Sequence, residues 1–420
     1  MYIPPFIYGI FNSILYVWGL TWWIILPFLF FFIFADSWLI FKRLKNIRSI
    51  EWKLLEIKVP TDILKTPKAM EQVFAACHAT YSFGFNFRAK YIEGKVEEWM
   101  SFEIVSIGGY IHFYIRVPKQ YQSLIETAIY AQYQDAEIIE GQDYLNDLPT
   151  TFPNKIYEIF GSELLFTKDN AYPIKTYPSF EEITEERRLD SMAPIMEVLS
   201  RLKNNQRIFI QILIRPTGDA WKKAGEKLIE KLMGKQSSTK KSGLLYEINE
   251  LLKDIFKALP IWPGVYLAGM SKSTQKESSL PKLTHGQEEV IKKIEEKISK
   301  IGFETTIRYI YIDKKDSFSR ENIAALNGAF RQFNTQNLNA FKPNIEAMTV
   351  AKGMFKDIKI KNKKRLIFER YRSVMMNKTI ILNTEELATL YHFPILAYKS
   401  SMIKKIEYKK GEPPPDLPVV

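Results

Sequence analysis

The side chains best suited to metal chemistry are few in this 420-residue chain: one cysteine and four histidines. Cys77 and His78 are adjacent in a segment with helical periodicity, where neighbouring side chains point in different directions, so we interpret the pair as structural. His112, His285 and His392 show no metal-ligand spacing. A single cysteine also excludes an intramolecular disulfide and is compatible with a reducing compartment. The sequence therefore predicts no metal site and no other cofactor.

The motifs of nucleotide-dependent and hydrolytic enzymes are absent from the sequence. The pairs Gly94-Lys95 and Gly234-Lys235 lack the upstream glycine and the following Ser or Thr of a Walker A loop. Backbone amides would therefore not cradle a phosphate there. No G-x-S-x-G elbow, no H-E-x-x-H helix and no strand-linked G-x-G-x-x-G occurs. We expect a protein that is not an enzyme.

Basic side chains gather toward the C-terminal end. The net charge is +12, and residues 351–410 hold fifteen Lys and Arg against five Asp and Glu. Such a segment suits nucleic acid, an anionic membrane or an acidic partner, although a solvated lysine-rich surface has the same composition. Phe355, Phe368 and Tyr371 are interleaved with it, which is typical of surfaces that stack bases. The predicted contacts to nucleic acid or an acidic partner are Lys361, Lys363, Lys364, Arg365, Arg370 and Arg372.

The first 35 residues carry no charged side chain, and residues 14–34 form an apolar run of about 20 residues, enough to cross a hydrocarbon core. Four basic residues follow within 42–48, so the positive-inside rule places the rest of the chain in the cytoplasm and the N-terminus outside. A cleaved signal peptide is disfavoured, because no charged segment precedes the run and no small-residue site follows it. A helical hairpin over 4–41 is disfavoured by Asp36 and its short length. The predicted anchor residues are Trp18, Trp22, Trp23, Pro27, Lys42, Arg43, Lys45 and Arg48.

Residues 51–150, after the anchor region 1–50, follow the order strand, helix, strand, strand, helix, strand. Gly108-Gly109 marks the turn of the hairpin. In its second arm, isoleucine, phenylalanine and valine alternate with His112, Tyr114 and Arg116, which predicts a strand with two different faces. The predicted strands are at 55–59, before the glycine pair, at 111–117 and at 136–139, and the helices at 68–80 and 120–132. This order predicts a ferredoxin-like split βαβ domain.

A similar order recurs in residues 151–400, which predicts a second, expanded domain. The chain is thus expected to be an α+β protein, with tandem ferredoxin-like domains and antiparallel sheets behind a transmembrane helix. An insertion at 234–285 encloses an amphipathic helix at 244–259, which packs on its own domain or lies on a membrane or a partner. The predicted helices are at 188–203, 219–233, 286–301 and 320–332, and the strands at 207–214, 304–313 and 379–382.

The C-terminal segment is predicted to connect the second domain to a partner. Thr384 is placed to cap a helix, acidic residues fill its first turn, and Pro394 ends it. Residues 401–420 are basic and Pro-rich, which is typical of a semi-rigid spacer. The apolar face of the helix also suits a core, so a purely structural role stays open. The residues predicted to dock a partner are Glu385, Glu386, Leu387, Tyr391, His392 and Pro394.

Several segments carry a resemblance to a known family: SFEIVSIGGYIHFYIRVP, AIYAQYQDAEI, IFIQILIRP, GAFRQFNTQNLNAFKPN, LNTEELATLYHFP and the ending GEPPPDLP. Over residues 50–418 the chain resembles the amino-terminal, non-ATPase half of membrane-anchored proteins of candidate-phylum bacteria. In many relatives a HerA/FtsK-superfamily motor follows the connector, similar to the TraG/TraD-type coupling ATPases of type IV secretion and conjugation. This chain departs from that pattern by ending first, so no ATP-binding residue can be carried over. The ATPase is then expected on a separate or missing segment.

The resemblance implies a non-catalytic docking component of a DNA- or protein-translocating motor at the inner membrane. The expected partners are the bilayer, a HerA/FtsK-type ATPase, further copies of the chain and DNA, while the cargo stays open. The alternative hypothesis is a membrane-tethered protein that binds nucleic acid through the basic C-terminal region. The two hypotheses differ in whether binding of DNA by the chain alone falls steeply with salt.

Overall fold

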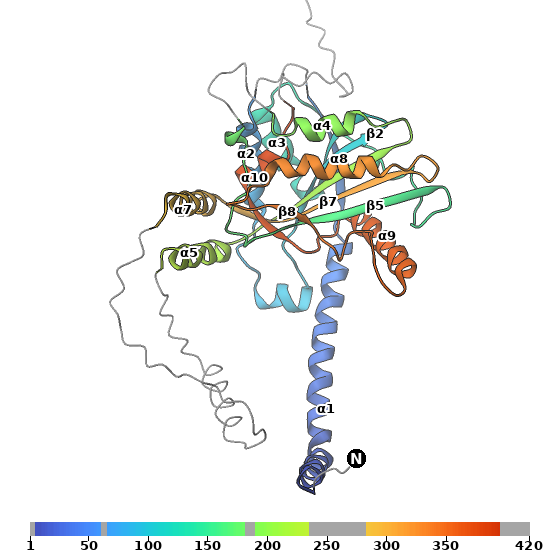
Figure 1. Ribbon diagram of the computed structural model, residues 1–420, viewed down its shortest axis with the longest axis vertical. Helices are drawn as coiled ribbons and strands as arrows, with labels where there is room; N and C mark the ends of the chain where they lie inside the picture. The colour runs from blue at the N-terminus through green and yellow to red at the C-terminus, as the bar shows by residue number, and fades with distance from the viewer. Residues whose placement is uncertain (1–4, 60–64, 181–189, 235–282, 395–420) are drawn as a thin grey trace, which may run out of the picture.

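Helix α1 (Pro5–Arg48) is 44 residues long and precedes the rest of the fold. The computed structural model describes residues 5–59, 65–180, 190–234 and 283–394. Within α1, Thr21–Arg48 is long and apolar enough to cross a membrane, and none of its most apolar window is buried in the protein. Figure 1 shows α1 leaving the body as a free-standing helix. The sequence prediction of an N-terminal apolar helix is confirmed at this level.

Nine strands of the described residues form one antiparallel sheet. Its order is β4-β1-β3-β2-β6-β7-β5-β8, and β9 pairs with β7. Apolar β-branched and aromatic side chains dominate these strands, which suits a sheet that is buried on both faces. The strands are β1 (Trp52–Lys58), β2 (Met100–Ile107), β3 (Tyr110–Pro118), β4 (Glu137–Glu140), β5 (Tyr157–Phe166), β6 (Arg207–Pro216), β7 (Gly302–Lys314), β8 (Phe341–Pro343) and β9 (Ile380–Asn383).

The prediction of tandem domains, each with its own sheet, is not confirmed. Strands β4-β1-β3-β2 do follow the order of a split βαβ unit, and β8-β5-β7-β6 repeats that order in the second half. However, β2 and β6 pair over eight residues, from Met100↔Ile214 to Ile107↔Arg207. Each would be an edge strand in a separate domain, with unpaired backbone groups. Pairing satisfies both edges and makes one sheet of the two halves.

Five helices cover one face of the sheet, which we call the helix-covered face. Inward-facing side chains such as Ile111, Ile115, Ile210 and Ile212 meet these helices in one continuous core. The alternation read from the sequence is confirmed here, since His112 and its partners lie on the other face. The helices are α2 (Pro67–Cys77), α3 (Gln122–Gln132), α4 (Ala193–Ser200), α8 (Arg320–Phe330) and α10 (Thr384–Leu390).

The opposite face, which we call the α9 face, is covered by helix α9 (Lys356–Arg372) and by loop residues between 144 and 152. Phe152 and Phe368 pack edge to face there, with ring centroids 4.7 Å apart. Figure 1 shows α4 and α8 on one side of the sheet and α9 on the side from which α1 extends.

Helices α5 (Ala220–Leu232) and α7 (His285–Ile298) lie side by side at one end of the body and pack through Ile229 and Ile294. Gly225 permits this approach, because a Cβ there would lie 2.7 Å from a methyl carbon of Ile298. The two helices border the insertion between β6 and β7. The amphipathic helix predicted at 244–259 falls outside the described residues.

Candidate functional site

A row of polar side chains runs across the α9 face, in register from strand to strand. The pairings Glu56↔Tyr114, Tyr114↔Glu103, Glu103↔Gln211, Gln211↔Arg308 and Arg308↔Glu163 place one polar residue on each of six adjacent strands. Residues at paired positions share a face of a sheet, so these side chains line up under α9. All six are buried. We call this set the polar row.

The centre of the polar row joins the two halves of the sheet to α9. Tyr144 donates a hydrogen bond to Glu103 Oε2 (2.8 Å) and lies 2.7 Å from the hydroxyl of Tyr371 on α9. Gln211 Nε2 donates to Glu103 Oε1 (3.0 Å) and to the carbonyl of Tyr371 (3.2 Å). Because Glu103 lies on β2 and Gln211 on β6, these bonds close the seam between the halves.

Arg308 is the other centre of the polar row. Its Nη2 is 2.7 Å from Glu163 Oε1, and both side chains are fully buried. Its guanidinium also donates to Gln211 Oε1 (2.9 Å) and to the carbonyls of Arg370 (3.0 Å) and Met375 (2.8 Å). One side chain thereby ties β5, β6 and β7 to the last turn of α9 and to Met375 just beyond it, which makes it a structural centre.

Burial dominates the electrostatics of Arg308 and of the two tyrosines that contact the polar row. Burial raises the pKa of Tyr144 and of Tyr371 well above their ordinary value, and the Glu103 carboxylate raises both further. Burial lowers the pKa of Arg308, against the attraction of Glu163. Neutral phenols and a paired guanidinium are held as hydrogen-bonding groups rather than as acids or bases in a cleft.

Three surface hollows lie away from the polar row. One, of about 450 Å³, is at the base of α1, between Asn46 and Gln120. The other two, of about 220 and 450 Å³, adjoin each other between α7 and the loop at Thr335–Leu338. Neither Glu103 nor Arg308 lines any of the three, so the chemistry of the row has no opening among them.

The basic residues predicted to contact nucleic acid lie together on α9, but only part of them is exposed. Helix α9 holds eight basic and two acidic side chains. Lys363 donates to the carbonyls of Ile345 (2.7 Å) and Val350 (2.9 Å), and Lys364 pairs with Glu158. These two lysines fasten α9 to neighbouring segments. The exposed ones are Lys361, Arg365 and Arg372, while Arg370 is half-buried.

The prediction that aromatic residues of this segment stack bases is wrong for two of the three. Phe368 and Tyr371 are each 1% exposed and belong to the core under α9. Their spacing of three places them on one side of the helix, which is the side that packs on the sheet. Phe355, at 65% exposed, is the one that stays accessible.

The residues predicted to anchor the chain lie on α1, outside the protein core. Trp18, Trp22 and Trp23 are about half exposed or more, and Pro27 lies inside the helix, which continues on both sides of it. Lys42 places its ammonium 4.9 Å from the ring centre of Trp38. Lys42 and Arg43 are half-buried against the body, whereas Lys45 and Arg48 are exposed.

The prediction of a docking surface on α10 is wrong for most of its residues. Leu387, Tyr391 and His392 are at most 1% exposed, and His392 is held between Asp190 Oδ1 (2.9 Å) and the carbonyl of Ala388 (2.8 Å). A partner could not reach them while the fold is intact. Glu385 and Pro394 are half-buried and are the two members that solvent reaches. Glu385 also pairs with Lys300.

Glu386 has a structural role that sequence reasoning missed. It is fully buried and lies 3.0 Å from Nζ of the fully buried Lys297 on α7. Backbone N–H groups of Ile174 and Asn383 also donate to its carboxylate, each at a distance of 3.0 Å. Asn383, rather than Thr384, caps α10, since its side chain accepts from the N–H of Glu386. A lysine in an otherwise amphipathic helix gives no sign in the sequence that it is buried.

Among the described residues, no group of three or more His, Cys, Asp or Glu side chains could hold a metal. Burial raises the pKa of the Cys77 thiol to about 12, which keeps it protonated and poorly nucleophilic. His78 lies 3.2 Å from the carbonyl of Thr217 through its Nε2, so it serves the fold.

A family model described as "Domain of unknown function (DUF8128)" matches residues 42–405. No curated protein matches the chain. The matched region begins near the end of α1 and takes in the sheet, the polar row and α10. The similarity therefore covers the α+β body, and leaves the apolar part of α1 outside it.

Proposed function

The chain belongs to the DUF8128 family, and we propose that it is a membrane-anchored, non-catalytic docking component of a machine that moves DNA or protein across the cytoplasmic membrane. Two features support this proposal. The chain resembles the non-ATPase half of type IV secretion and conjugation proteins, and an apolar helix is joined to a body whose buried polar groups serve the fold. The bilayer holds α1, with the N-terminus outside and the body in the cytoplasm.

The observation that carries the proposal is the firm junction between α1 and the sheet. Ile47 of α1 packs against a cluster that contains Trp99, Leu213 and Val374. This cluster is itself fixed, because Trp99 Nε1 donates to the carbonyl of Val374 at a distance of 2.6 Å. Three residues separate the end of α1 from β1. A helix fixed in this way holds the body at a defined place relative to the bilayer, which is what a docking platform requires.

The test of this function uses the full chain and a chain shortened by residues 401–420. The connector begins beyond the buried residues of α10, so this deletion leaves the core of α10 in place, whereas one from Thr384 would remove Leu387 and Tyr391. Both chains are tagged, expressed in the native host, purified from membranes and compared by quantitative mass spectrometry. We expect a HerA/FtsK-superfamily ATPase to co-purify with the full chain and to be lost with the shortened one.

Two controls accompany this comparison. Equal recovery from the membrane fraction and equal unfolding temperatures establish that the shortened chain still folds. An ATPase retained at the same level by the shortened chain would contradict docking through the connector. The absence of any ATPase from both preparations would contradict the proposed function.

We also propose that each half of the sheet is a ferredoxin-like unit and that the platform forms homo-oligomers. The repeated strand order supports the first idea. Superposition of β1–β4 on β5–β8 tests it, because α2 should then fall on α4 and α3 on α8. Light scattering of the detergent-solubilised chain tests the second idea, and a mass equal to one chain would contradict it.

The second candidate function is nucleic-acid binding through α9. It is favoured by the exposed Lys361, Arg365 and Arg372, and by Lys352, Lys356 and Lys359 near the start of the helix. Lysine and arginine that neutralise phosphates release counterions, which makes affinity fall with salt. Because α9 lies on the side from which α1 extends (Figure 1), anionic lipid headgroups would compete with DNA for it.

We predict that the triple variant Lys359→Ala, Lys361→Ala, Arg365→Ala binds DNA more weakly and with a lower salt dependence. Each lost phosphate contact should reduce the slope of log K against log salt by about 0.9 for a duplex. Fluorescence anisotropy of the detergent-solubilised chain at several salt concentrations measures this. A matched control replaces Lys222, Lys223 and Lys227 of α5 by alanine. Equal slopes for both triple variants, or no binding by the unmodified chain, would rule out this function.

A further inference from the structure

We propose that residues 81–95, which we call the aromatic loop, insert into the headgroup region of an anionic bilayer beside α1. This second membrane contact rests on the proposed function, since it requires α1 to be embedded. The aromatic loop contains the π-helical turn η2 (Arg88–Glu93) and lies between α2 and β2.

The aromatic loop exposes large apolar side chains that a water-facing loop would not normally carry. Phe83 is 88% exposed, Phe87 73%, Ile92 55% and Tyr91 41%. The rings of Phe87 and Tyr91 lie 4.8 Å apart, so they form one patch rather than isolated residues. An exposed apolar patch on a soluble surface marks contact with a membrane or another molecule.

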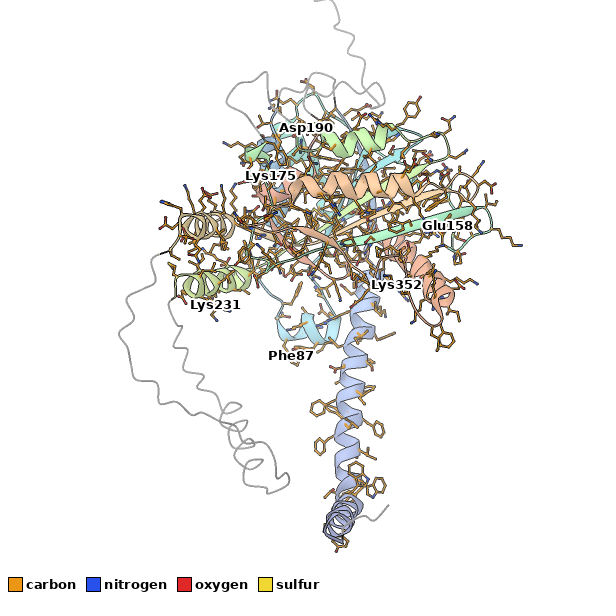
Figure 2. The ribbon with its side chains drawn as sticks, in the orientation of Figure 1. Phe87, Glu158, Lys175, Asp190, Lys231 and Lys352 are labelled. Carbon is orange, nitrogen blue, oxygen red and sulfur yellow. The ribbon has the colours of Figure 1, made fainter. Side chains whose placement is uncertain are left out.

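The position of the aromatic loop favours the membrane as its occupant. A Cβ on Gly94 would lie 2.5 Å from the carbonyl carbon of Lys42, so the loop is in close backbone contact with α1 at the start of its basic segment. Phe34 ends the apolar run, and Lys42 is eight residues after it, so the contact with the loop lies about 12 Å along the helix from the apolar part. Figure 2 shows Phe87 beside α1, farther toward the N-terminal end of that helix than the other labelled residues.

The charges of the aromatic loop suit an anionic interface. The loop holds three basic residues, Arg88, Lys90 and Lys95, and one acidic residue, Glu93. The side chain of Arg88 is 79% exposed. The ammonium of Lys90 lies 5.3 Å from the ring centre of Tyr91. Basic side chains among aromatic ones are typical of segments that lie at the headgroup level, where the rings enter the acyl boundary and the cations meet lipid phosphates.

The backbone of the aromatic loop is held by hydrogen bonds within the loop and by one to Glu97 beyond it. Phe83 adopts a left-handed conformation (φ 55°) and Gly84 follows it at φ 100°. Such a conformation is strained for a bulky residue, and burial of the Phe83 ring does not offset it. The N–H of Ser82 donates to Glu97 Oε2 (3.2 Å), and the N–H of Ala89 donates to Asn86 Oδ1 (2.8 Å). The fold thus presents these rings outward in a fixed arrangement.

The test uses single-cysteine reporters in the full chain, reconstituted in nanodiscs of phosphatidylcholine and phosphatidylglycerol. The native Cys77 is 1% exposed and should not be labelled in the folded protein. An environment-sensitive NBD dye is attached at Ile92→Cys. Tyr110→Cys is the matched control, because Tyr110 is equally exposed (56%) but lies far from α1. Tyr110 begins β3, and it is the opposite end of β3, at Pro118, that pairs with Trp52 close to α1. Ile33→Cys reports on α1.

We expect the Ile92 reporter to emit at shorter wavelength, to be quenched by lipids with a spin label near the headgroup, and to be protected from iodide several-fold relative to the Tyr110 reporter. Replacing phosphatidylglycerol by phosphatidylcholine should reduce the lipid quenching, and Arg88→Glu with Lys90→Glu should reduce it in the anionic bilayer. The Ile33 reporter should be quenched by lipids with a spin label deep in the acyl chain.

The other outcomes separate this inference from the membrane anchor. If Ile33 is quenched by lipid while Ile92 behaves like Tyr110, the aromatic loop does not enter the bilayer and α1 does. If Ile92 is protected from iodide but not quenched by lipid, protein covers the loop, a second copy or a partner, and the inference is wrong. If Ile33 is open to iodide, the anchor and the inference fail together.

Discussion

Replacing Arg308 by methionine is expected to lower the free energy of unfolding by about 3–5 kcal/mol. The change leaves the Glu163 carboxylate buried without its cation. Only the side-chain amides of Asn344, at 3.4 Å, and Asn377, at 2.7 Å, would still donate to it among its side-chain partners. It also leaves the carbonyls of Arg370 and Met375 without the guanidinium. Arg308→Lys should recover little of this loss, because a single ammonium cannot donate to all four acceptors that the planar guanidinium reaches. Thermal unfolding of the detergent-solubilised chain, followed by near-ultraviolet circular dichroism, measures the loss.

The matched control for Arg308 is Arg215→Met on the neighbouring strand β6. Arg215 pairs with Glu304, but both side chains are about 30% exposed, so the pair should contribute only about 0–1 kcal/mol. Similar unfolding temperatures for the two variants would contradict the central role assigned to Arg308 in the polar row.

Replacing Lys297 by methionine is the second change with a large expected effect, again about 3–5 kcal/mol. Burial raises the pKa of Glu386 and lowers the pKa of Lys297, each against the attraction of the partner. The charged pair is therefore costly to bury, and removing one member leaves the other without compensation. The same reasoning predicts that the double variant Lys297→Met, Glu386→Leu loses less stability than the two single changes added together.

A double-mutant cycle of unfolding free energies measures this coupling. Lys293→Met is the matched control on the same helix, since Lys293 is 50% exposed and pairs with Glu296 over 2.7 Å. If Lys297→Met costs no more than Lys293→Met, or if the two single changes are additive, the buried pair is not what fixes α7 to α10.

The sequence was sufficient to predict the strands whose two faces differ and the helices with a clear apolar stripe. The alternation in β3 predicted which of its residues share a face, and Pro118 marked its end. Strand β5 was missed because Gly161, Ser162 and Glu163 interrupt its apolar pattern. Gly161 is required there, since a Cβ would lie 2.8 Å from a side-chain carbon of Ile367. Helix α9 was interpreted only as a basic segment and not as a helix that packs on the sheet, because its buried apolar residues are few and lie on one narrow side.

The joining of the two halves could not be read from the sequence at all. The first half has the element order of a split βαβ unit by itself, and nothing local indicates that β2 and β6 are partners. The polar row could have been suspected from Glu103, Gln211 and Arg308, each of which lies inside a strand among isoleucines and phenylalanines. A charged residue in such a position must find a partner in the fold, but which one depends on the strand order.

The joined sheet also determines how a mechanical force would pass through the molecule. Tension between α1 and a partner bound beyond Pro394 would enter at β1 and leave at β9, which are separated by β3, β2, β6 and β7. The force would cross five ladders of backbone hydrogen bonds, including the eight-residue seam between β2 and β6. No covalent path shorter than most of the chain bypasses them. If α1 spans a bilayer and a partner binds there, the pull would pass through the central strands of the sheet, and the weakest of these ladders would set the force at which the fold yields.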